Sequence, residues 1–194
     1  MSKRTLIAFL IIFMLSLSLG FTAGAYVLAP SHLAKNSTFW YSIGNSISDA
    51  GCYSIVVADN QWNGISGRKV YLAKSSTRND QTTRTKNGTN EIFHQNLGGT
   101  GDLALTRCWA TNGITIEADT ALNTYYPLSN SVPPISTSYC VKSLMVHEMG
   151  HWIGLDESNY DSMSQSVMSP TQKPGVSDYT LKVDDINGYY AIDW

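Results

Sequence analysis

The stretch His147-Glu148-Met149-Gly150-His151-Trp152-Ile153-Gly154-Leu155-Asp156-Glu157 decides the interpretation of this chain. Its two histidines are four residues apart, so on a helix both imidazoles project from one face and can bind one metal ion. Glu148 then lies beside that metal. A carboxylate there can accept a proton from a zinc-activated water that attacks a peptide carbonyl. The motif therefore predicts a zinc site for metal-assisted hydrolysis.

The alternative interpretation is an amphipathic helix whose histidines only pack or face solvent. The chain contains 4 His among 194 residues. With so few histidines, the pattern H-E-x-x-H is expected by chance only roughly 0.002 times per chain. The metal site is therefore the favoured interpretation.

Such a zinc site needs a third protein ligand. A Glu from a second helix further along the chain is excluded, because no Glu follows Glu157. The other arrangement places the ligand six residues after the second histidine, with a glycine between them that ends the helix in a left-handed turn. Gly154 and Glu157 occupy these places, and Asp156 is an alternative ligand one residue out of register.

This spacing, followed by Ser166-Val167-Met168-Ser169-Pro170, resembles the metzincin metallopeptidases and their Met-turn. Residues 181–192 resemble the last helix of one metzincin branch, the matrixins, and residues 114–123 are similar to the matrixin strand that precedes the active-site helix. The resemblance implies an α+β metzincin-type fold, with a mixed twisted β-sheet of about five strands and three α-helices. It also implies a zinc endopeptidase acting on protein or peptide substrates, with Met168 beneath the zinc.

The chain departs from the matrixin pattern at two side chains. The third ligand of matrixins is a histidine, and Glu157 stands in its place. Gly154-Leu155-Asp156 is similar to the matrixin lead-in to that ligand, so we predict Glu157 rather than Asp156. Its negative charge weakens the pull of zinc on water, which leaves open a zinc-containing binding module without turnover. The other departure is Gln172, where matrixins usually have a Tyr in the wall of the specificity pocket.

Matrixins also carry structural calcium, so Ca²⁺ is a second possible cofactor. Glycine-rich loops next to an aspartate can bind calcium, and the only such loop here is Gly98-Gly99-Thr100-Gly101-Asp102. Too few carboxylates converge there to define a site.

The N-terminal residues have the features of a leader. Lys3 and Arg4 precede a stretch without charge, Leu6 to Ala29, which contains the small-x-small sequence Ala23-Gly24-Ala25. We predict a signal peptide over residues 1–25, cleaved before Tyr26, and a secreted matrixin-like metallopeptidase domain over residues 26–194. The alternative is an uncleaved membrane anchor within residues 6–29. The polar and glycine residues that interrupt the stretch favour cleavage, after which no stable membrane association is expected.

The composition excludes other classes of protein. A formal net charge of -2 with scattered basic residues argues against nucleic-acid binding. After cleavage the chain has a length suited to one domain, and we expect a monomer.

The three cysteines, Cys52, Cys108 and Cys140, are an odd number for an oxidising compartment. We expect one disulfide. A bridge between Cys108 and Cys140 would tie the sheet to the active-site helix, and Cys52 would be a buried thiol, although spacing alone leaves the pairing open.

Hydrophobic periodicity predicts the remaining elements. It indicates a helix over residues 42–62, strands over 69–73, 91–94, 102–109 and 113–118, and a polar loop over 74–90. One of the hydroxyl residues Ser136, Thr137 and Ser138 is expected to cap the active-site helix, and Asp184 or Asp185 is expected to cap the final helix. In the matrixin arrangement one strand lies at the sheet edge beside the cleft, where an extended substrate can pair with it.

Overall fold

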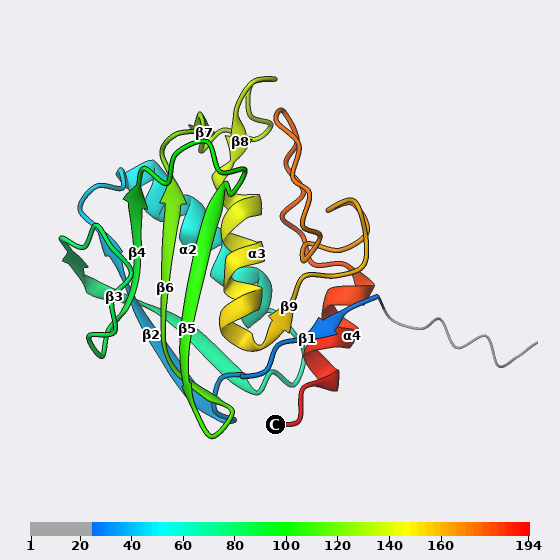
Figure 1. Cartoon of the computed structure of the whole chain (residues 1–194). Helices are drawn as coiled ribbons and strands as arrows, with labels where there is room; N and C mark the ends of the chain where they lie inside the picture. Colours follow the sequence, from blue (N-terminus) through cyan, green and yellow to red (C-terminus); the bar gives the residue numbers. More distant parts are fainter. Residues whose placement is uncertain (1–24) are drawn as a thin grey trace, which may run out of the picture.

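The computed structural model describes residues 25–194, and its central feature is a five-stranded sheet with helices packed on one face (Figure 1). The strand order is β3-β2-β4-β6-β5; the first four are parallel, and β5 runs antiparallel at the edge. The strands are β2 (Ser37–Gly44), β3 (Val70–Asn79), β4 (Asn90–Gln95), β5 (Ala104–Thr111) and β6 (Ile114–Asn123).

Three helices and four short strands complete the described part of the chain. The helices are α2 (Asp49–Asn63), α3 (Val141–Ile153) and α4 (Val183–Ala191). Strand β1 (Val27–Leu28) pairs with β9 (Leu155–Asp156), and β7 (Leu128–Ser129) pairs with β8 (Tyr139–Cys140). The mixed five-stranded sheet and three helices confirm the predicted α+β class.

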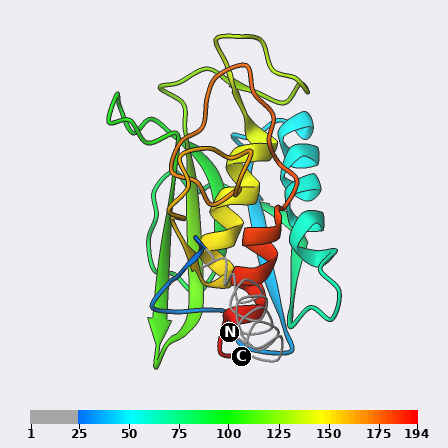
Figure 2. The same ribbon diagram turned by 90° about the vertical axis from the view of Figure 1, so that its right-hand side faces the viewer.

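Helix α3, which carries the histidine motif, is fixed from two sides by tryptophans. Trp152 lies between α3 and the sheet, with ring centroids 5.6 Å from Phe39 and 5.5 Å from Tyr41, and its indole N–H donates to Thr120 Oγ1 at 3.0 Å. Trp62 of α2 donates to the Val146 carbonyl at 2.9 Å, and α2 and α3 lie side by side (Figure 2). Each buried aromatic stabilises the fold by about 1.5–3 kcal/mol, so α3 is a rigid support.

The predicted first helix is wrong over residues 42–48, about its first two turns. Residues 42–44 end strand β2, and α2 begins only at Asp49, where the Ser48 hydroxyl caps it by accepting from the Gly51 N–H at 3.3 Å. The apolar residues Ile43 and Ile47 fit a helix, but Ile43 also continues the period-two burial of Phe39 and Tyr41. Pairing with β3 and β4 places residues 42–44 in strand β2 instead of the helix.

Two other local predictions are also wrong. Residues 74–79, expected in a loop, extend β3, because their backbone groups pair with β2 although their side chains are polar. The active-site helix has no serine cap: it follows Cys140 directly, and Tyr139 and Cys140 pair with β7 instead.

The expected disulfide between Cys108 and Cys140 is also wrong, because all three cysteines are free. Cys140 precedes the first residue of α3, whereas the Cys108 thiol lies 3.8 Å from the carbonyl of His151, near the other end of that helix. Ten helical residues separate these points by about 15 Å, far beyond the reach of a disulfide. Cys52 is buried, as predicted.

Residues 1–24 of the predicted leader lie outside the described part of the chain, and only its last residue, Ala25, is described. Residues 25–29 belong to the fold: the Ala25 and Tyr26 N–H groups donate to Asp184 Oδ1 at 2.9 and 3.1 Å, and Ala29 N–H donates to the Gly154 carbonyl. Among the described residues, no helix combines the length and hydrophobicity of a membrane span.

Candidate metal centre and active-site cleft

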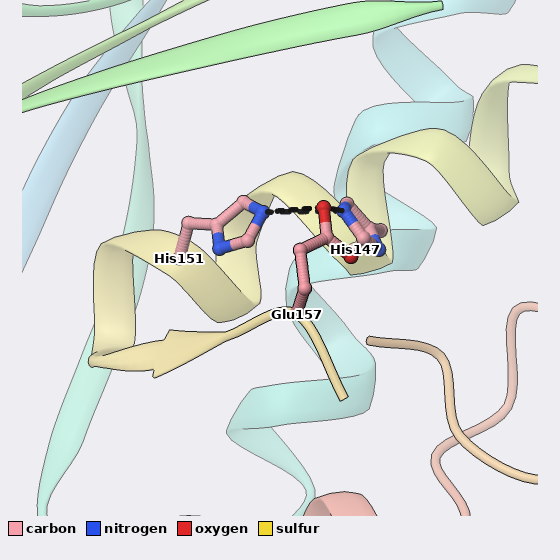
Figure 3. Close-up of side chains that lie close together, drawn as sticks. All are labelled: His147, His151 and Glu157. Atoms are coloured by element: carbon pink, nitrogen blue, oxygen red, sulfur yellow. Dashed lines mark hydrogen bonds and ion pairs between the residues drawn. The ribbon is translucent and has the colours of Figure 1, made fainter. Parts of the chain in front are cut away.

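The side chains of His147, His151 and Glu157 converge above one face of α3 (Figure 3). The two Nε2 atoms are 3.1 Å apart, and Glu157 Oε1 lies 3.3 Å from that of His147 and 3.8 Å from that of His151. Within residues 25–194 this is the one group of three or more such side chains able to hold a metal ion. The structure thus brings together the three predicted ligands.

The other nitrogen of each ring shows how the imidazoles are oriented. His147 Nδ1 lies 2.9 Å from the Val167 carbonyl, and His151 Nδ1 lies 2.9 Å from the Leu155 carbonyl. A carbonyl oxygen only accepts, so each Nδ1 carries the hydrogen, and in a neutral ring Nε2 is left with a bare lone pair. Two bare lone pairs 3.1 Å apart repel each other unless a cation or proton lies between them.

These separations suit zinc. A point equidistant from the two Nε2 atoms and Glu157 Oε1 lies about 2.0 Å from each, the usual length of zinc bonds to His and carboxylate ligands. Hydrogen bonds from the outer ring nitrogens to fixed carbonyls are the usual support of metal-binding histidines. The donor set therefore fits a zinc ion with three protein ligands.

Without a cation, the site holds a proton instead. Burial alone would lower the pKa of His147, but the hydrogen bond to Glu157 and the charges of Glu148 and Glu157 raise it to about 9. Burial alone would raise the pKa of Glu157, but its contacts with His147 and His151 hold it below the usual value. A metal ion must displace this proton in order to bind.

The turn at Gly154 brings Glu157 back towards the histidines. Gly154 ends the helix with a positive φ of 128°, as predicted from the sequence. A Cβ on this residue would lie 2.5 Å from the Cβ of His32. Strand β9 follows at once and is held by β1. Asp156 is exposed, and its carboxylate accepts from the Glu157 N–H at 2.8 Å. Glu157, and not Asp156, therefore lies beside the histidines.

Met168 lies buried against the same helix. A Cβ on Gly150 would lie 2.2 Å from its sulfur, so only glycine lets this turn approach α3 so closely. The turn is held by Asp185, which is fully buried and accepts from Ser166 Oγ at 2.5 Å, from the Val167 N–H at 3.1 Å and from the Lys182 N–H at 2.7 Å. Of these bonds, only the one from the Lys182 N–H belongs to the predicted cap of α4.

Asp185 therefore reaches the candidate ligands indirectly. Its Oδ1 also accepts from the Met168 N–H at 3.4 Å, and this N–H belongs to the same peptide as the Val167 carbonyl that accepts from His147 Nδ1. Sequence reasoning misses this function, because two acidic residues at the start of an apolar helix indicate only a cap and carry no sign of a distant turn.

Glu148 lies in α3 directly after His147. It is 4% exposed and lines the same cleft as the two histidines, and its Oε2 atom is buried without a hydrogen-bond partner. Because the residue lines the cleft, its carboxylate can accept a proton from a molecule bound there.

The cleft has a volume of about 460 Å³ and lies between α3, strand β5 and the segment Ser169–Gln172. Strand β5 forms the edge of the sheet, so the predicted edge strand beside the cleft is present. In the loop of residues 98–102, Asp102 accepts a hydrogen bond from Thr100 Oγ1 at 3.3 Å, and this loop contributes to no metal-binding group among the described residues. Calcium binding stays a prediction.

Comparison with protein families gives one result. The sequence model described as matrixin matches residues 55–192 of the 194, which include the second half of α2, all of α3, the cleft and the three candidate ligands. Comparison with curated proteins finds no match.

Proposed function

Since this chain belongs to the matrixin family of metallopeptidases, we propose that it is a secreted, zinc-dependent endopeptidase. The observation that carries the proposal is the pair of histidine Nε2 lone pairs that face each other at 3.1 Å beside the Glu157 carboxylate. These lone pairs repel each other unless a proton or a cation lies between them, and with zinc each atom is a ligand.

His147, His151 and Glu157 hold the zinc in this proposal. When bound, zinc supplies Lewis acidity, which lowers the pKa of a water and polarises the scissile carbonyl. The chain contributes the orientation of the ligands: the carbonyls of Val167 and Leu155 fix both rings, and the Gly154 turn fixes Glu157.

Glu148 is the general base. Its carboxylate lines the cleft and accepts the proton of the attacking water, and the resulting carboxylic acid can pass that proton to the nitrogen of the leaving amine.

The substrate of a peptidase is a protein or peptide, and β5 is the element suited to align it. An edge strand has unpaired backbone N–H and C=O groups on its outer side, so an extended segment can add to the sheet across the cleft. We propose that the substrate binds to β5 in this way, between the strand and the segment Ser169–Gln172.

Secretion is proposed from the sequence of the leader, with cleavage before Tyr26 and a monomeric peptidase domain over residues 26–194. N-terminal sequencing of the protein recovered from culture medium tests this part. A chain that begins with Tyr26 is expected; an intact N-terminus in the membrane fraction would favour the anchor.

A binding module without turnover is the second candidate, because Glu157 adds a negative charge where matrixins have a histidine. The deciding experiment measures cleavage of an unfolded protein by the purified zinc-loaded chain, with zinc content determined alongside. Glu148→Ala is expected to keep zinc and lose cleavage. Zinc-loaded wild type that cuts nothing would favour the binding module, and Glu157→His then tests whether the ligand is responsible.

The ligand assignment has a matched pair of variants. Glu157→Ala is expected to lower zinc affinity, whereas Asp156→Ala is expected to retain zinc, because only Glu157 lies beside the histidines. The opposite result would assign Asp156.

A further inference from the structure

The segment that forms the wall of the cleft opposite β5 is held in a defined position. Its Thr171 N–H donates to Ser169 Oγ at 3.2 Å, and the Gly175 N–H donates to the Ser138 carbonyl at 2.9 Å. Gly175 has φ 78°, and a Cβ there would lie 3.0 Å from the Cα of Ser136. The wall is therefore tied to the loop that leads into α3.

Gln172 lies in this wall, and only the nitrogen of its side-chain amide makes a hydrogen bond. Its Nε2 donates to the Cys140 carbonyl at 3.4 Å, whereas its Oε1 is buried and has no hydrogen-bond partner. Turning the amide over would place Oε1 against the Cys140 carbonyl, so that two acceptors would face each other. The amide orientation is thus set by Cys140, and the unpaired atom is an acceptor.

No group among the described residues donates to this oxygen. Gln172 lines the cleft together with the buried side chains of Leu144 and Met163, and it also lines a smaller cavity of about 30 Å³. A buried acceptor without a partner is unfavourable. An occupant of either space that carries a donor can supply the missing partner.

We propose that this part of the cleft selects a substrate side chain that ends in a hydrogen-bond donor, such as Asn or Gln, over an apolar side chain of the same shape. This inference rests on the proposed endopeptidase function and specifies its substrate class. A pocket with a buried acceptor disfavours a side chain that lacks a donor, because the acceptor is then left unpaired. This effect on substrate preference is stronger than that of a small difference in apolar contact.

The test compares the wild type with Gln172→Met, which keeps the length of the side chain and removes the acceptor. Cleavage of a peptide mixture by the zinc-loaded chain, followed by sequencing of the products, identifies the position next to the cut bond whose preference changes. Peptides with Asn or Leu at that position are then compared, because these side chains have nearly the same shape. The Asn-to-Leu ratio of kcat/KM is expected to be about tenfold higher for the wild type than for Gln172→Met.

Gln172→Glu provides the conservative variant in its protonated form. The carboxylic acid can donate to the Cys140 carbonyl through its O–H and keep an acceptor at the same place, so at a pH at which it is protonated it should retain the preference for a donor. Loss of the preference in both variants would show that the change reflects disturbed packing of the wall, and this would overturn the inference.

Two further outcomes separate this inference from the proposed function. Equal Asn-to-Leu ratios in wild type and Gln172→Met, as expected if a water in the smaller cavity already pairs with Oε1, would overturn the inference and leave the endopeptidase intact. If the wild type cuts no peptide, the proposed function fails. The same two peptides are then compared by fluorescence-anisotropy binding to both proteins, where a tenfold ratio of Kd values supports the pocket and equal values overturn it.

Discussion

Replacing Asp185 by alanine tests how the fold supports the candidate zinc site. The carboxylate of Asp185 is fully buried and accepts hydrogen bonds from Ser166 Oγ and from the N–H groups of Val167 and Lys182. A hydrogen bond to a charged group contributes about 1.5–3 kcal/mol, and water entering the cavity would recover part of the loss. We expect Asp185→Ala to lower the free energy of unfolding by about 4 kcal/mol, a large effect for one substitution.

The same variant is expected to weaken zinc binding although Asp185 touches no ligand. The turn that it holds contains the Val167 carbonyl that accepts from His147 Nδ1. Loss of a hydrogen bond that orients a metal-binding histidine typically costs 10–100-fold in metal affinity, so we expect the zinc Kd to rise about tenfold.

Both quantities are measured separately. Urea unfolding of the metal-free protein gives the stability without the contribution of bound zinc, and competition with a chromogenic chelator gives the zinc Kd. Tyr41→Phe is the control, because it removes a buried hydrogen bond of 2.5 Å to Asp59 without contacting the turn. It should lower stability and leave the zinc Kd unchanged. A normal zinc Kd in folded Asp185→Ala would refute the reasoning, since the turn would then not orient His147.

Three further predictions concern packing and pH. Gly150→Ala would place a Cβ 2.2 Å from the sulfur of Met168, and it should destabilise the protein by about 1–3 kcal/mol in thermal unfolding. Burial, together with the charge of Glu91, raises the pKa of Asp119 to about 7, so the native state binds this proton more tightly than the unfolded state. Stability should fall as the pH rises from about 4 to 7, and Asp119→Asn should raise Tm at pH 8 but change it little at pH 4; equal shifts at both values would contradict this. The raised pKa of His147, about 9, stabilises the metal-free protein at low pH and ceases to do so as the pH passes 9. Zinc binding should accordingly release a proton and tighten as the pH rises towards 9, which calorimetry in buffers of different ionisation enthalpy measures; binding without proton release would be inconsistent with a protonated His147.

The sequence alone predicts those parts of the site that depend on local helical geometry. His147, Glu148 and His151 lie within one turn of a helix, so their spacing determines which face they share whatever the rest of the fold does. Gly154 is equally local, because its positive φ ends the helix just where the chain must turn back. The matrixin family and the α+β class follow from these residues together with the Met-turn and the last helix, and the family comparison confirms them.

Prediction from sequence is wrong where the same residues fit both a helix and a strand, and where the distance between two residues in the folded chain determines whether they can form a bond. Ile43 and Ile47 suit a helix or a strand, and only pairing with β3 and β4 assigns residues 42–44 to β2. A bridge from Cys108 on a strand to Cys140 at the start of the active-site helix is predicted from the sequence, but the structure places the Cys108 thiol near the opposite end of that helix. Neither outcome is encoded in spacing, because both depend on which segments lie side by side after folding.

The sequence by itself therefore determines the chemistry offered by this chain: two imidazoles and a carboxylate at helical spacing, and a glycine that turns the chain back. Only the tertiary structure decides which later carboxylate joins the histidines, since β1 and β9 direct Glu157 towards them and leave Asp156 in solvent. It also gives Asp185 its place under the Met168 turn and leaves Gln172 with an unpaired acceptor in the cleft wall. The physical reason is that these interactions join segments far apart in the chain, whereas periodicity reports only on neighbours within a few residues.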